Sequence, residues 1–213
     1  MKTDDLIAML ATGTAPVPQR ATSRRLSVAL LIGLPLSVAC MVTVYGVRRD
    51  LMQVMSLPMF WVRLAFPICM VVAGFVIVQG LARPGARVHL AWLGLALPVL
   101  VIWSMALMML ASAPAEQRPA LVMGQTWRTC TMNIAFISVP VFAAMIVALK
   151  GLAPTRPALA GAAAGAMAGA AGAAVYALHC QELAAPFLAV WYVVGIAVPA
   201  IAGALLGPRL LRW

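Results

Sequence analysis

Charged side chains are scarce in this sequence of 213 residues, and acidic ones are scarcer still. Charged residues make up 9% of the chain, whereas roughly 25% is usual in a soluble domain. This scarcity excludes a water-soluble globule, and a mean hydropathy of +1.02 excludes a disordered low-complexity chain. The net charge of +10 rests on too few residues to form a solvated basic surface, so we predict membrane lipid as a partner and no direct contact with nucleic acid.

The sequence also lacks the motifs of the common enzymes. It contains no P-loop, no dinucleotide-binding fingerprint, no hydrolase triad motif and no His-Glu-x-x-His pair. A thiol-disulfide or quinone-linked membrane oxidoreductase is a weaker alternative, because its usual Cys-x-x-Cys pair is absent as well. We therefore predict that the protein is not an enzyme and that it has no resident cofactor.

What the sequence does contain is a series of long apolar stretches. A helix that rises 1.5 Å per residue needs about 20 apolar residues to cross a hydrocarbon core of roughly 30 Å. We predict such spans at residues 26–47, 63–82, 88–111, 132–149, 157–178 and 187–207. The expected fold is all-α, a polytopic membrane protein with a bundle of six transmembrane helices. Residues 1–25 are left as a cytoplasmic N-terminal segment and linker, and residues 26–213 form the transmembrane domain.

The basic residues predict the orientation, because Lys and Arg in short loops are retained on the cytoplasmic side. With the N-terminus inside, ten basic residues lie inside, namely Lys2, Arg20, Arg24, Arg25, Arg83, Arg87, Lys150, Arg156, Arg209 and Arg212. Five lie outside, namely Arg48, Arg49, Arg63, Arg118 and Arg128. This distribution predicts that both termini are cytoplasmic.

The predicted spans contain no acidic or basic residue near their midplanes. Proton and ion relays through membranes use such groups, so their absence argues against a coupled transporter. A passive pore survives this objection. A transport or channel component for a metal or a small solute is therefore kept as the alternative function.

The fifth predicted span differs from the others because it consists almost entirely of Ala and Gly. Gly161, Gly165 and Gly169 recur every four residues and so line one face of a helix. Small residues let another helix approach closely, in the same chain or in a second copy. We favour packing within the chain and expect this span to lie inside the bundle; a homo-oligomer is the alternative.

Two of the four cysteines are predicted to meet at the outer surface. Cys130 lies before the inner loop that joins spans four and five, and Cys180 lies after it, at similar distances along the two antiparallel helices. Both stand in polar sequence, whereas Cys40 and Cys69 lie within apolar spans and are expected to pack as small apolar residues. The outer pair suits a redox switch, a fixed disulfide, or a transient metal ion with His179 and Glu182 as helpers.

The N-terminal sequence MKTDDLIAMLATG predicts a short amphipathic helix. Asp4 and Asp5 suit the positive end of its dipole, and Leu6, Ile7 and Leu10 share one face. About ten residues are marginal as an isolated helix, so the apolar face needs a groove on a partner protein or a membrane surface. The Pro-containing spacer that follows favours a protein partner.

Four segments together resemble the NrsF family of bacterial membrane proteins, negative regulators of an extracytoplasmic-function sigma factor of the sigma-F type. They are MKTDDLIAMLATG, WRTCTMNIAFISVP, LAPTRPALAGAAAGAMAGAAGAAVYALHCQELAAPF and WYVVGIAVPAIAGALLGPRLLRW. The resemblance implies an anti-sigma factor of the inner membrane whose N-terminal segment holds the sigma factor. It also implies that the cysteines matching Cys130 and Cys180 sense envelope stress from oxidants or metals.

Overall fold

The computed structural model describes residues 3–11, 21–83 and 90–212, and the statements below refer to these residues. Lys2, Arg20 and Arg87, which were assigned to the cytoplasmic side, lie outside them. Helices account for the regular structure of the described residues, without a strand. Six helical segments are long and apolar enough to cross a membrane, which confirms the predicted all-α class and the number of spans.

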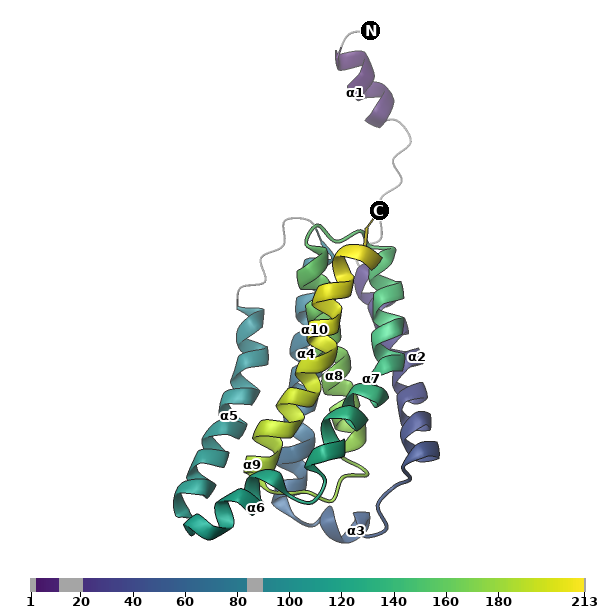
Figure 1. Cartoon of the computed structure of the whole chain (residues 1–213). Coiled ribbons are helices and arrows are strands. Elements are labelled where there is room, and N and C mark those ends of the chain that lie inside the picture. Colours follow the sequence, from purple (N-terminus) through teal and green to yellow (C-terminus); the bar gives the residue numbers. More distant parts are fainter. Residues whose placement is uncertain (1–2, 12–20, 84–89, 213) are drawn as a thin grey trace.

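The six long helices run up and down through a single bundle (Figure 1). They are α2 (Ala21–Val44), α4 (Pro58–Leu81), α5 (Ala91–Ser112), α7 (Trp127–Lys150), α8 (Pro157–Tyr176) and α10 (Val193–Leu210). Short elements complete the chain: α1 (Thr3–Ala11), α3 (Leu51–Val54), the 3-10 turn η1 (Ala115–Gln117), α6 (Arg118–Met123), α9 (Ala185–Phe187) and the π-helical turn η2 (Leu188–Tyr192).

The bundle has two distinct ends. Helix α2 begins and α10 ends at one of them, which we call the terminal end (Figure 1). At the other end lie α3, α6 and α9, together with the first turn of α7 and the turn after α8. Cys130 and Cys180 belong to these last two segments, so we call this the cysteine end.

Helix α8 is the centre of the bundle and packs against α10, α4 and α7. Fourteen of its 20 residues are buried, as its weakly hydrophobic Ala and Gly content predicts. A side chain at Gly161 would collide with the carbonyl oxygen of Gly203 on α10, and one at Gly165 with that of Pro199. Gly169 faces Ile196 and Pro199 in the same seam. The partner of the glycine face is therefore a helix of the same chain.

Several helices begin earlier than their predicted spans. Helix α4 begins at Pro58 and α7 at Trp127, each five residues before the predicted start, and α2 begins at Ala21 within the segment assigned to the linker. The added turn of α7 carries polar residues beside Cys130 that resemble a loop in a hydropathy pattern, whereas Arg63 is the first residue of the predicted span 63–82. The bundle buries the side chains of both Arg63 and Cys130, which lie near the cysteine end.

Candidate functional site

Cys130 and Cys180 come together at the cysteine end, from opposite sides of the α7–α8 hairpin. Cys130 lies in the first turn of α7, where its backbone N–H donates to the Thr126 carbonyl at 2.9 Å. Cys180 follows α8, and its backbone N–H still donates to the Tyr176 carbonyl at 2.9 Å. The two residues are 0% and 1% exposed, and their thiols are free and close enough to interact. The expected proximity is present, but both thiols are buried rather than lying at an open rim.

The loop around Cys180 is held by a buried arginine, Arg63, which was counted among the five basic residues on the outer side. Arg63 on α4 is 0% exposed. Its guanidinium donates to the carbonyls of Ala177 at 2.6 Å, Cys180 at 2.9 Å and Glu182 at 2.8 Å. Its Nε has no hydrogen-bond partner, and the ring of Phe60 lies 5.3 Å from its Cζ atom. Arg63 therefore lies inside α4, buried near the cysteine end, and its assignment to the outer side of the membrane stays a prediction.

The segment after α2 holds the same loop from another side. Arg48 donates to the Cys180 carbonyl at 2.8 Å and forms a bidentate ion pair with Asp50 at 2.8 Å. The hydrogen bond with Asp50 raises the pKa of Arg48 and lowers that of the Asp50 carboxyl. The Arg48 backbone N–H donates to the Leu178 carbonyl at 3.2 Å. Cys180 is thus fixed through its own carbonyl oxygen by two guanidinium groups.

The surroundings of Cys180 favour its ionised form. The hydrogen bond with Cys130 is the largest influence and, with the others, lowers the pKa of Cys180 to about 6. The backbone N–H of Glu182 and the charge of Arg63 act in the same direction, while burial opposes them. The hydroxyl of Tyr192 contributes as well; it is buried and makes no hydrogen bond of standard geometry. A lowered pKa favours the thiolate, the form that reacts with oxidants and binds soft metals.

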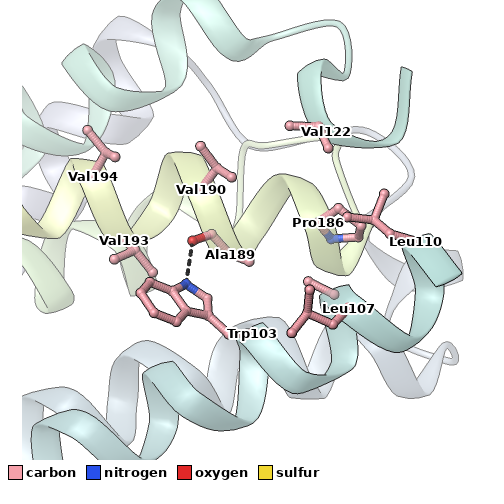
Figure 2. Close-up of a pocket in the computed structure, with 10 residues that line it drawn as sticks. Trp103, Leu107, Leu110, Val122, Pro186, Ala189, Val190, Val193 and Val194 are labelled. Atoms are coloured by element: carbon pink, nitrogen blue, oxygen red, sulfur yellow. Dashed lines mark hydrogen bonds between the residues drawn. The ribbon is translucent and has the colours of Figure 1, made fainter. Parts of the chain in front are cut away.

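Tyr192 reaches this site through an irregular part of the last long helical segment. It ends the π-helical turn η2, a type of turn that appears often at functional sites. Figure 2 shows the indole of Trp103 donating to the Ala189 carbonyl within η2, at 2.9 Å. The indole N–H of Trp191 likewise donates to the Val122 carbonyl at 2.9 Å. Neighbouring helices therefore hold η2 in place.

The other two predicted helpers point elsewhere. The Nδ1 atom of His179 lies 2.9 Å from the Gly46 carbonyl oxygen. The Glu182 carboxylate accepts a hydrogen bond of 2.6 Å from the Gln125 backbone N–H. Both side chains thus tie the Cys180 loop to adjacent loops. In the described part of the chain, no three His, Cys, Asp or Glu side chains are grouped to hold a metal ion, so a metal here would have the two thiols as its nearest ligands.

The predicted N-terminal helix forms and buries none of its side chains. Helix α1 carries Asp4 and Asp5 in its first turn. Its apolar face is open, with Leu6 at 39% exposure, Ile7 at 59% and Leu10 at 67%. Figure 1 shows α1 outside the bundle, beyond the terminal end. An open apolar face on a short helix is a surface for a partner.

Comparison with known proteins agrees with these features. Residues 10–213 match the family model of NrsF, described as negative regulator of sigma F. A protein of Azospira oryzae named probable anti-sigma-F factor NrsF is 45% identical over the full length of both chains. One of Caulobacter vibrioides named anti-sigma-F factor NrsF is 36% identical, again over all of both chains. No solved structure matches this chain. The chain therefore belongs to the NrsF family of negative regulators of sigma F.

Proposed function

We propose that this protein is an anti-sigma factor of the bacterial inner membrane, which holds an extracytoplasmic-function sigma factor through α1. Membership of the NrsF family and the names of its two relatives support a sigma factor as the partner. The observation that carries the binding mode is the open face of α1, because Leu6, Ile7 and Leu10 pack against nothing in the bundle. A groove on the sigma factor would cover this face and stabilise a helix too short to be stable alone.

Copurification tests this binding mode directly. Full-length protein should bring down a sigma factor from its native host, and the triple change Leu6→Gln, Ile7→Gln, Leu10→Gln should abolish the capture. Ala8→Gln is the matched control, since Ala8 lies about 155° from the centre of this face at 100° per residue. It should leave the capture intact. Equal capture by the triple variant would place the sigma contact elsewhere.

The six long helices support an inner-membrane location, and the basic residues support the orientation. Both termini, and α1 with them, then lie in the cytoplasm with the sigma factor. The cysteine end faces the envelope, a compartment that permits disulfides. Arg63 remains at that end, so its burial does not change the distribution of charge between the two sides.

We also infer that Cys130 and Cys180 sense stress on the envelope side and that a change there releases the sigma factor. Their contact supports formation of a disulfide: the two thiols lose two electrons and two protons, which hydrogen peroxide accepts to give two water molecules. The pair allows one other chemistry: Cys130 and Cys180 would be the residues to hold a soft metal, as thiolates. Either change moves the Cys180 loop relative to α7.

Helix α2 supplies a physical route from this pair to α1. Its C-terminal end leads into the Arg48 segment that holds Cys180. Along its length, the buried Ser37 hydroxyl donates to the Ile137 carbonyl of α7 at 2.7 Å. At the terminal end, Arg25 donates to the Gly151 carbonyl at 3.0 Å, just after α7. A shift of α7 against α2 therefore reaches the helix that follows the N-terminal segment.

A further inference from the structure

The two cysteines of the pair are not equivalent in their surroundings. We propose that Cys180 is the reactive thiolate of the pair and that Arg63 is the positioning residue whose buried charge holds it in that form. The proposal deepens the sensing role inferred above and depends on it for its biological meaning. The chemistry itself concerns only the cysteine end and is measurable without a sigma factor.

The charge on Arg63 is the starting point. Its hydrogen-bond acceptors are three neutral carbonyl oxygens, and no carboxylate pairs with it among the described residues. A buried cation without a counter-ion is strongly unfavourable. The nearby Asp50 carboxylate is half exposed and already pairs with Arg48. A negative charge on the neighbouring Cys180 sulfur would neutralise the Arg63 guanidinium inside the bundle.

The groups around Cys180 identify it as the member that carries the charge. Arg63, the Glu182 backbone N–H and the Tyr192 hydroxyl all favour a thiolate there. Cys130 lies beside that sulfur, and its charged neighbour besides Cys180 is the Glu182 carboxylate. A second negative charge on Cys130 would face two anions. The pair is therefore arranged as one thiolate and one thiol.

Other charged and titratable groups surround Arg63 and Cys180. Among these groups, Arg63 is a cation that no carboxylate pairs with. They come from every adjoining segment: Arg48 and Asp50 after α2, Cys130 on α7, Tyr176 on α8, Tyr192 in η2, and His179 and Glu182 beside Cys180. Arg48 is paired with Asp50, and the ring of His179 contacts a backbone carbonyl. The pKa of Cys180, lowered to about 6, agrees with this arrangement.

A titration of thiolate absorbance in full-length purified protein tests the proposal. The signal of Cys180 is the difference between the parent and Cys180→Ser, so access of a reagent to the buried site does not matter. In the parent, this signal should rise with a midpoint near pH 6. In Arg63→Gln, the midpoint should move up by about one to three pH units, since an opposite charge this close shifts a pKa by that amount. With a shift of two units, the thiolate fraction at pH 7 falls about tenfold.

Two further variants separate the charge of Arg63 from its hydrogen bonds. Arg63→Lys keeps the charge but loses the guanidinium fork, so its midpoint should stay at least about one unit below that of a free cysteine, near 8.5. Arg49→Gln removes an exposed charge from the same end of the bundle and should leave the midpoint unchanged.

Three results would overturn the assignment. The first is a parent midpoint near that of a free cysteine, which needs no variant to fold. The second is an unchanged midpoint in folded Arg63→Gln. The third is a midpoint in Arg63→Lys equal to that of a free cysteine, because Arg63 would then act through its carbonyl bonds alone.

Discussion

At the cysteine end of the bundle, guanidinium groups from two segments converge on a single loop and fix Cys180 beside Cys130. Beyond the terminal end, α1 exposes three large apolar side chains and buries none. The first region is preorganised and complete within the chain, as a site for small reactants must be. The second is incomplete until a partner covers it. This difference supports the proposal that one end detects a stimulus and the other binds a partner.

The largest effect should come from removing the incomplete region. Deletion of residues 1 to 13 should leave genes controlled by the sigma factor constitutively active, because it removes the open apolar face of α1 that is proposed to hold the sigma factor. A transcriptional reporter measures this. The truncated protein must still accumulate in the membrane, which an immunoblot checks. Continued repression by an accumulated truncated protein would contradict the division of roles.

A substitution in the seam between α8 and α10 should destabilise the bundle that connects the two ends. Gly165→Leu forces a side chain against the Pro199 backbone and should destabilise the protein by about 3 kcal/mol or more, at the upper end for overpacking. Thermal unfolding in detergent measures the loss. Ala96→Leu is the control: Ala96 is exposed on α5, the long helix with the smallest buried share. Equal stability of the two variants would show that the seam is not tightly packed.

A smaller effect on stability is expected from a substitution at Glu182. This substitution tests whether Glu182 is a metal ligand or only a contact between two loops. Glu182→Ala loses the hydrogen bond from Gln125 and should lower stability by about 1 kcal/mol. The reporter should still respond to the stress that activates the parent, because the two thiols remain. Loss of the response to a metal alone, with an intact response to peroxide, would instead make Glu182 a ligand.

The two remaining cysteines should have no effect on sensing. Cys40 and Cys69 lie within α2 and α4, and Cys69 is exposed. The double variant Cys40→Ala, Cys69→Ala should repress and respond like the parent in the same reporter. A lost response would mean that Cys40 or Cys69 is also needed for sensing.

Much of this architecture could be predicted from sequence, because hydropathy and residue counting govern it. The six spans follow from apolar length, the interior position of α8 from its Ala and Gly content, and the approach of Cys130 to Cys180 from similar helix lengths on either side of one loop. The role of α1 stays a prediction, since its partner is another protein.

The immediate surroundings of the cysteines could not be predicted in the same way. Arg63 stands at the start of an apolar run, where a charged residue is usually taken as the end of a loop. Its hydrogen-bond acceptors are backbone carbonyls, which every residue has, so the sequence does not indicate them. Tyr192 depends on the register change of a π-helical turn. His179 and Glu182 have residue types suited to metals, but backbone groups of adjacent loops fix their side chains.

The most direct test of the account is the amount of sigma factor that copurifies with the protein before and after cells meet hydrogen peroxide. The parent should hold the sigma factor at rest and lose most of it on exposure. The variant Cys130→Ser, Cys180→Ser should hold it under both conditions, while Cys40→Ala, Cys69→Ala should behave as the parent. Release from the Cys130→Ser, Cys180→Ser variant to the same extent as from the parent would contradict the claim that this cysteine pair controls the partner held by α1.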